Sequence, residues 1–274
     1  MKKLALLVLS IFTIGWAHSQ TKKSKKRPEK ILFVVTSHDK KGNTGEKTGY
    51  YLGEVSHPWE VLQKAGYEID FVSPQGGTPP VDGFDLEDPV NKEFWENEEY
   101  KNKIDHSMKP SQVKANDYSA IFYAGGHGAM WDFADNTEIA SIASKIYENG
   151  GIVAGVCHGP AGLVTIKLNN GKYLVDGKKI SAFTNEEEAA VQLTDVVPFL
   201  LEDQLKERGA KFEKSGMWQN HVVTDQRVIT GQNPRSAKNV GKAILKELKK
   251  KITIPAINKK EAINTKASFY FKLF

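Results

Sequence analysis

The chain has 274 residues, of which 40% are hydrophobic and 26% are charged, values typical of a globular protein with a substantial core. Its formal net charge of +5 comes from its two ends, because residues 31–248 alone contain 23 basic and 31 acidic residues, a net charge of −8. This acidic body argues against nucleic acid as a partner, since a nucleic-acid-binding domain carries its positive charge on a folded face.

The first twenty residues have the pattern of a secretory signal peptide. Two lysines precede an apolar run at 4–17, and the small residues that follow predict cleavage near Ser19 or Gln20. The run is about 14 residues long, shorter than the roughly 20 that span a bilayer, so we expect no stable membrane anchor; a retained anchor is the alternative. The sequence thus predicts a signal peptide at 1–19, a basic linker at 20–29, and export to the periplasm or the extracellular space.

The first predicted elements form a strand–helix–strand unit. Residues 30–38, "KILFVVTSH", are a continuous apolar run that predicts a buried strand. Helical spacing in 49–66 predicts a helix that ends at Gly66, and 67–74 predict a second strand. This order predicts a parallel sheet with a right-handed crossover. Residues 75–118 are polar and irregular, and we expect them to be an insertion over one end of the sheet.

The second half of the chain continues the alternation. Buried strands are predicted at 120–126 and 152–157, with a helix between them at 136–151. Four elements are expected downstream: a hairpin with Asp176–Gly177 at its turn (172–184), a helix (186–209), a late hairpin (222–234) and an amphipathic helix that begins at Ser236. Residues 30–248 therefore predict one α/β domain, followed by a basic C-terminal extension at 249–274.

The only cysteine, Cys157, ends the predicted strand at 152–157 within the sequence "GVCHG". A strand that runs into a helix through Gly-x-Cys-x-Gly is typical of a nucleophile elbow, where Gly155 and Gly159 avoid clashes in a strained turn. The dipole and free N–H groups of that helix are expected to lower the thiol pKa and to hold an oxyanion. The alternative is a buried, inert thiol. The adjacent His158 is either a surface residue or a base.

Five motifs carry a family resemblance. The segments "GEVSHPWEVL", "YAGGHGAMWDF", "GVCHGPAG", "AFTNEEE" and "ITGQNPRSA" occur in this order between about Lys30 and Leu248. Together they resemble the ThiJ/PfpI superfamily, and in particular its branch of glutathione-independent glyoxalases III and stress chaperones. The resemblance implies the class I glutamine amidotransferase fold: a flavodoxin-like three-layer sandwich with a mostly parallel central sheet, a nucleophile elbow and a small inserted lid.

The resemblance also implies roles for individual residues. Cys157 would be the nucleophile, and His158, directly after it, the base. A carboxylate after the next predicted hairpin would orient the histidine; the family spacing selects Glu188, with Glu186 and Glu187 as alternatives because the three glutamates are consecutive. On the residues alone, a solvated helix start also fits two of the three glutamates.

Two further contacts of the thiol are implied by the resemblance. Glu54, in "GEVSHP", would hydrogen-bond the thiol, although the sequence alone indicates a surface helix residue. The backbone N–H groups of Gly126 and His158 would form the oxyanion hole. We interpret His127 as a pocket wall, because the histidines show no metal-binding spacing, and "GGHG" lacks the lysine and spacing of a phosphate-binding loop. No metal or cofactor is expected.

The implied function is that of a glyoxalase III, or D-lactate dehydratase: a glutathione-independent lyase that converts methylglyoxal to D-lactate. The substrate would be a small aldehyde, protein deglycase activity would share the first step, and the family implies a homodimer. A stress-related holdase chaperone, a redox-sensing protein and a cysteine peptidase-like hydrolase are the alternatives; a small lid argues against bulky peptide substrates. The export signal departs from the family, whose characterised chemistry is usually intracellular.

Overall fold

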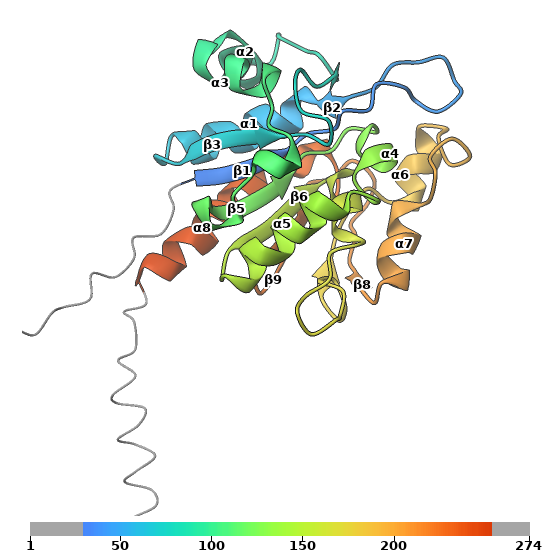
Figure 1. The fold of residues 1–274 in the computed structure, drawn as a ribbon. Helices are drawn as coiled ribbons and strands as arrows, with labels where there is room; N and C mark the ends of the chain where they lie inside the picture. The colour runs from blue at the N-terminus through green and yellow to red at the C-terminus, as the bar shows by residue number, and fades with distance from the viewer. Residues whose placement is uncertain (1–29, 254–274) are drawn as a thin grey trace, which may run out of the picture.

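The computed structural model describes residues 30–253, without the side chains of 251–253. The predicted signal peptide, the basic linker and residues 254–274 of the predicted extension lie outside the described residues. At the centre is a six-stranded sheet, parallel except for its last pair (Figure 1). In spatial order its strands are β3 (Glu68–Val72), β1 (Lys30–Val34), β5 (Tyr118–Tyr123), β6 (Ile152–Val156), β10 (Val228–Gly231) and β9 (Val222–Asp225).

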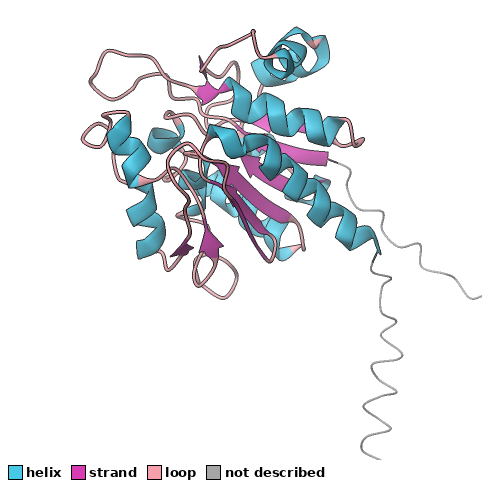
Figure 2. Ribbon diagram, turned by 180° about the vertical axis from the view of Figure 1, so that it is seen from behind, coloured by secondary structure: helices cyan, strands magenta, loops and turns pink. Residues whose placement is uncertain are grey.

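Helices cover both faces of this sheet. Helices α1 (Leu52–Gln63) and α8 (Ala237–Thr253) pack against each other on one face, as seen in Figure 2, and α5 (Thr137–Glu148) lies on the other face (Figure 1). Helix α8 continues past Leu248, so the first residues of the predicted C-terminal extension belong to this helix. The result is the predicted flavodoxin-like three-layer sandwich. None of the helices in residues 30–253 is long and apolar enough to cross a membrane.

Successive side chains of a strand point to opposite faces of the sheet and so contribute to two separate hydrophobic cores. In β1, Ile31 and Phe33 join the cluster beneath α1 and α8, whereas Leu32 and Val34 join the cluster beneath α5. Every residue of β5 and β6 is buried, which is why both segments read as continuous apolar runs. Because the parallel strands end at the same edge, the loops that follow β1, β5, β6 and β10 meet there, where open α/β sheets place their ligand sites.

The insertion at 75–118 is more regular than the sequence predicts. It contains helices α2 (Pro89–Glu96) and α3 (Glu98–Asp105), next to α1 and β3 (Figure 1). Asp88 caps α2 by accepting hydrogen bonds from two backbone N–H groups, and Asn97 caps α3. The helices anchor through aromatic contacts with Trp59 of α1. The prediction of an irregular segment was wrong because these two short helices depend on tertiary contacts that composition does not reveal.

Two predictions for the segment 172–209 were also wrong. There is no hairpin at Asp176–Gly177; instead β7 (Lys179–Ile180) pairs in parallel with β8 (Lys211–Phe212). The single predicted helix is two short helices, α6 (Asn185–Ala190) and α7 (Leu201–Glu207). The chain leaves α6 through Gln192, whose φ is 61°, and Pro198 lies in the connecting segment, so continuous helical backbone is not possible.

The late hairpin is confirmed as the antiparallel pair β9–β10, and the last helix begins at Ala237, directly after Ser236. The remaining elements are short. They are β2 (Tyr50–Tyr51), β4 (Val81–Asp82), α4 (Ala129–Asp132) and the 3₁₀ helices η1 (Pro110–Gln112), η2 (Ala115–Asp117), η3 (Gly159–Leu163) and η4 (Pro234–Ser236).

Candidate active site

Cys157 occupies a sharp, strained turn at the end of β6. Its φ of 58° lies in the left-handed region, which costs a non-glycine residue about 1–3 kcal/mol. Its N–H donates to Gly231 O and its carbonyl accepts from Phe183 N, both at 2.9 Å, so neighbouring segments hold the strained backbone in place. A Cβ at Gly159 would lie 2.1 Å from Tyr123 O, so this position requires glycine. The local geometry is that of the predicted elbow.

The electrostatics of the thiol differ from the prediction. The segment after the elbow is the five-residue 3₁₀ helix η3, not a long α-helix, and the thiol is buried. Burial and the nearby Glu54 carboxylate raise the pKa of Cys157 well above its usual value, whereas the backbone N–H groups of His158 and Gly126 lower it to a smaller extent. The expected lowering of the thiol pKa was therefore wrong. The two predicted oxyanion donors do face the thiol.

Glu54 projects from α1 into the core beside Cys157 and is fully buried. Its Oε2 accepts a hydrogen bond from Gly125 N at 2.8 Å, while Oε1 has no hydrogen-bond partner among the described residues. Burial raises the pKa of Glu54 to about 8, although hydrogen bonding with the Cys157 thiol and with the backbone N–H of Gly125 opposes this rise. The buried carboxyl group therefore holds its proton more tightly than an exposed glutamate does, and only its ionised form raises the pKa of the thiol.

His158 lies between the thiol and a carboxylate. Its Nε2 donates to Glu188 Oε2 at 2.8 Å, and its Nδ1 lies 3.3 Å from Cys157 Sγ. Burial, followed by the charge of His127, lowers the pKa of His158 to about 4, so the ring is neutral near pH 7. Because the proton on Nε2 points at the carboxylate, the lone pair on Nδ1 is directed at the thiol. This tautomer is the one that a general base for Cys157 requires.

The three consecutive glutamates have three different environments. Glu186 is exposed and pairs with Lys214 at 3.1 Å. Glu187 is buried and accepts hydrogen bonds from the backbone N–H groups of Trp218 and Thr184, among others. Glu188 alone contacts His158, which is the placement that the family spacing selects.

His127 is more than the pocket wall that the sequence indicates. Its Nε2 donates to Glu188 Oε1 at 2.9 Å, and its ring centre lies 4.1 Å from that of His158. Burial disfavours a charged Glu188, but the hydrogen bonds from His127 and His158 outweigh it and lower the pKa of Glu188 to about 2. His127 thus holds the Glu188 carboxylate in position, and this carboxylate in turn orients His158.

These three residues also form a set of potential metal ligands. Donor atoms of His127, His158 and Glu188 lie within 4.8 Å of one another, a combination of imidazole and carboxylate that suits zinc. In this arrangement, however, both Nε2 atoms and both carboxylate oxygens already take part in mutual hydrogen bonds. A metal ion at this position would replace the Nε2 protons in these contacts, and with them the tautomer of His158.

Glu187, which the sequence indicates only as an alternative to Glu188, has a different role. It joins α6 to the loop before β9 and to the loop after β10. Its carboxylate accepts hydrogen bonds from Gln232 Nε2 at 3.1 Å and from Asn233 Nδ2 at 2.8 Å, in addition to the two backbone donors already named. The signal was present in the sequence, because Thr184 and Glu187 form a capping box at the start of α6. This network fixes the helix that presents Glu188.

The fold and the site define an α/β protein with a nucleophile elbow and a Cys–His–Glu relay. Residues 48–247 match the sequence profile of the DJ-1/PfpI family. The chain belongs to this family, which confirms the resemblance seen in the motifs.

Two curated relatives cover most of the chain. The glutathione-independent glyoxalase HSP31 of Saccharomyces cerevisiae is 37% identical over 229 residues, covering 77% of this chain and 94% of the relative. Glyoxalase 3 of Candida albicans is 35% identical over 222 residues, covering 76% and 93%.

Two solved structures are similar over the same region. The 24 kDa Rapid Encystment Protein of Francisella tularensis has a TM-score of 0.77 at 43% identity, covering 80% of this chain and 98% of that one. Glyoxalase III of Candida albicans has a TM-score of 0.75 at 32% identity, covering 80% and 96%.

Proposed function

We propose that this protein is a glutathione-independent glyoxalase of the glyoxalase III type, which converts methylglyoxal to D-lactate. One observation carries the proposal: Cys157 Sγ, His158 and Glu188 form a continuous relay of 3.3 and 2.8 Å contacts at the end of β6. Two relatives that cover most of the chain are both named glyoxalases, and they supply the substrate class. The relay alone would also serve other reactions of a cysteine nucleophile.

The first step is addition of the thiol to the aldehyde. Because the thiol pKa is raised, Cys157 rests in its protonated form and must lose its proton as it attacks. His158 Nδ1 accepts that proton while Sγ bonds to the aldehyde carbon and the former carbonyl oxygen takes up the negative charge, which the N–H groups of Gly126 and His158 stabilise. His158 then passes the proton to this oxygen, which gives the neutral hemithioacetal and returns the histidine to its neutral form.

The second step moves a proton between the two carbons of the substrate. His158, neutral again and oriented by Glu188, removes the proton on the sulfur-bearing carbon to give an enediolate. The hydroxyl proton moves to the neighbouring oxygen, and His158 returns its proton to the neighbouring carbon. The product is a thioester between Cys157 and a 2-hydroxy acid. Water then adds to the thioester carbon, the carbon–sulfur bond breaks, and the thiol recovers its proton. Methylglyoxal plus one water thus gives one lactate, without an external oxidant or reductant.

The test is D-lactate formation from methylglyoxal without glutathione or any other thiol. The proposal predicts turnover by the folded protein and a complete loss in Cys157→Ala. Glu186→Gln is the matched control, because it removes an exposed charge two residues from Glu188 without touching the relay. Absence of D-lactate from a folded, reduced wild-type protein would refute the substrate assignment.

A holdase chaperone role has no specific support among the described residues. It predicts a broad exposed apolar patch, whereas only four large hydrophobic side chains are exposed among the described residues: Tyr51, Phe84, Val191 and Met217. Protein deglycase activity would use the same first step and is tested by replacing methylglyoxal with a glycated peptide.

Export and dimerisation are also proposals. The lysine-initiated apolar run at 4–17 supports export, and N-terminal sequencing of the secreted or periplasmic protein tests it, with a mature N-terminus expected near Gln20. A full-length cytoplasmic product would overturn this proposal. The homodimer is tested by light scattering during size-exclusion chromatography, where a monomer mass would contradict it.

A further inference from the structure

Asp132, the last residue of α4, binds this short helix to the loop that follows β1. Its Oδ1 accepts a hydrogen bond from Thr36 Oγ1 at 2.8 Å, and its Oδ2 accepts one from Ser37 N at 2.7 Å. Thr36 Oγ1 in turn accepts a hydrogen bond from His38 N at 3.0 Å. One carboxylate therefore holds the backbone of residues 36–38 against α4.

The same loop also contacts the turn that precedes α4. A Cβ at Gly128 would lie 2.7 Å from both His38 O and Thr36 Cγ2, so the turn and the loop are in close contact at this point. The His38 ring stacks on the ring of Trp131, with the two ring centres 5.0 Å apart. The loop after β1 thus covers one side of both the turn and α4.

The turn and α4 form one hydrogen-bonded unit. Three successive N–H groups donate to carbonyl oxygens of the turn at 2.9–3.2 Å: Ala129 to Gly126, Met130 to His127 and Trp131 to Gly128. This turn supplies the Gly126 N–H that faces the thiol and the His127 side chain that binds Glu188. A displacement of α4 would therefore move both groups relative to Cys157.

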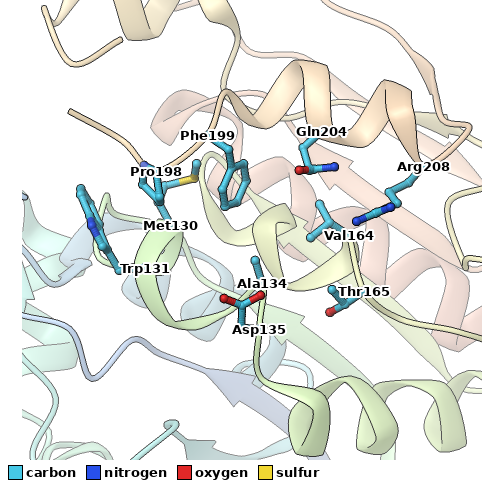
Figure 3. A pocket seen from close by; sticks show the side chains of 10 residues that line it. All are labelled: Met130, Trp131, Ala134, Asp135, Val164, Thr165, Pro198, Phe199, Gln204 and Arg208. Atoms are coloured by element: carbon cyan, nitrogen blue, oxygen red, sulfur yellow. The ribbon is translucent and has the colours of Figure 1, made fainter. Parts of the chain in front are cut away.

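Another side of α4 leaves room for such a displacement. Met130 and Trp131 line a cavity of about 310 Å³ together with Pro198 and Phe199 of the segment before α7 (Figure 3). Because this side of α4 borders a cavity, packing there restrains the helix less than a filled core would. The hydrogen bonds of Asp132 supply directional contacts that packing at the cavity does not.

We propose that Asp132 is a positioning residue for the candidate active site: by binding the loop after β1 it holds α4, and with it the Gly126 N–H group, in place against Cys157. The Gly126 N–H lowers the pKa of the thiol, so its correct placement favours the thiolate. The proposal concerns the geometry at the thiol and does not require methylglyoxal to be the substrate. Only the kcat measurement below rests on the proposed function.

The test is the rate at which iodoacetamide alkylates Cys157, the only cysteine of the chain, between about pH 8 and pH 10. Burial raises the pKa of Asp132 to about 6, although hydrogen bonds from Thr36 and Ser37 oppose this rise, so in this pH range the side chain is an ionised carboxylate. Below the thiol pKa, the alkylation rate is proportional to the thiolate fraction. Asp132→Ala removes both contacts and should slow alkylation at least about threefold, because the hydrogen bond that stabilises the thiolate is weakened.

The direction of the change separates positioning from a simple charge effect. Asp132→Ala also removes a negative charge, which on electrostatics alone would favour the thiolate and speed alkylation. Asp132→Asn removes the same charge, but its amide oxygen can accept from Ser37 N while its amide nitrogen donates to Thr36 Oγ1. This conservative variant should therefore be alkylated no more slowly than the wild type.

The loop side of the contact gives a second, independent pair of variants. Thr36→Val is isosteric but lacks the hydroxyl, and it should slow alkylation, whereas Thr36→Ser keeps the hydroxyl and should not. Asp135→Ala is the matched control, because it removes an exposed aspartate three positions after Asp132 and should leave the rate unchanged. All rates are measured well below the unfolding temperature of each variant, so that unfolded chains do not contribute.

The D-lactate assay adds a separate measurement. Asp132→Ala should lower kcat at least about threefold with little change in KM, because the Gly126 N–H acts on the oxyanion and not on the bound aldehyde. A wild-type protein that forms no D-lactate would contradict the proposed function, while the alkylation rates would still test the role of Asp132.

Two results would overturn the proposal. One is alkylation of a folded Asp132→Ala protein at or above the wild-type rate. The other is equal slowing in Asp132→Asn and Asp132→Ala, since the first variant keeps the contacts. If Asp132→Ala does not fold, the Thr36 pair decides, and equal rates for Thr36→Val and Thr36→Ser would overturn the proposal in the same way.

Discussion

Replacing Glu188 by glutamine tests the relay most directly. The carboxylate accepts one hydrogen bond from each histidine, at 2.8 Å from His158 and 2.9 Å from His127. A glutamine side chain has one acceptor and one donor group, so its amide nitrogen would face one of the two Nε2–H donors. At least one histidine must then change tautomer or move away. If His158 changes tautomer, its Nδ1 carries the proton and can no longer accept one from Cys157.

The expected loss follows from the contacts removed. A hydrogen bond to a charged partner is worth about 1.5–3 kcal/mol, and a positioned general base contributes about 10²- to 10⁴-fold to the rate. We therefore expect kcat for D-lactate formation to fall by about 10²- to 10⁴-fold in Glu188→Gln. KM should change little, because in the proposed reaction Glu188 acts through His158 and does not touch the substrate.

The pH profile of the activity distinguishes the loss of His158 positioning from general damage to the structure. In the wild type, Glu188 raises the pKa of His158 against the larger effect of burial, so its loss should lower that pKa further. The acidic limb of the residual activity should shift to lower pH in Glu188→Gln, whereas Glu186→Gln should keep both the wild-type rate and the wild-type profile. A folded Glu188→Gln protein with kcat within about threefold of the wild type would refute the relay.

Three further predictions concern the surroundings of the relay. Glu54→Gln should remove a pH dependence of stability: the folded-state pKa of Glu54 is raised to about 8, so its contribution is fully present below the unfolded pKa and is lost as pH rises toward 8. Urea unfolding from pH 5 to 9 should show a wild-type decline of a few kcal/mol that the variant lacks. Gly159→Ala should lower the unfolding temperature by several degrees or prevent folding, since its Cβ would meet Tyr123 O at 2.1 Å. Glu187→Ala should destabilise the protein by about 3 kcal/mol or more, because several buried donors lose their acceptor.

Each of these three predictions has a control and an outcome that would contradict it. A Glu54→Gln protein that retains the wild-type slope would show that another group causes the pH dependence. For the glycine, Gly150→Ala is a comparison at a position where nothing lies within 4 Å of the added Cβ, although its φ of 83° brings its own strain; equal losses would disprove the steric argument. For Glu187, the exposed Glu186→Ala should cost less than about 1 kcal/mol, and similar values for the two variants would contradict the proposed network.

The sequence by itself determined the layers of the fold and the position of the nucleophile. Strands such as β5 and β6 are buried along their whole length, so their apolar runs are visible without any knowledge of their neighbours. The elbow was equally readable, because the turn at Cys157 needs small residues on both sides within a few positions. These features depend on local covalent geometry and on short-range patterns.

Only the tertiary structure decided which polar groups meet and how they are charged. It brought Glu54 from α1 against Cys157, 103 positions later in the sequence, and it separated Glu188 from its two neighbours by the direction each side chain takes from α6. It also reversed the expected thiol pKa, because burial outweighs the two N–H groups that face the sulfur. The physical reason is common to all three: desolvation and long-range contacts depend on what surrounds a group in space, and a linear sequence specifies this only through the complete fold.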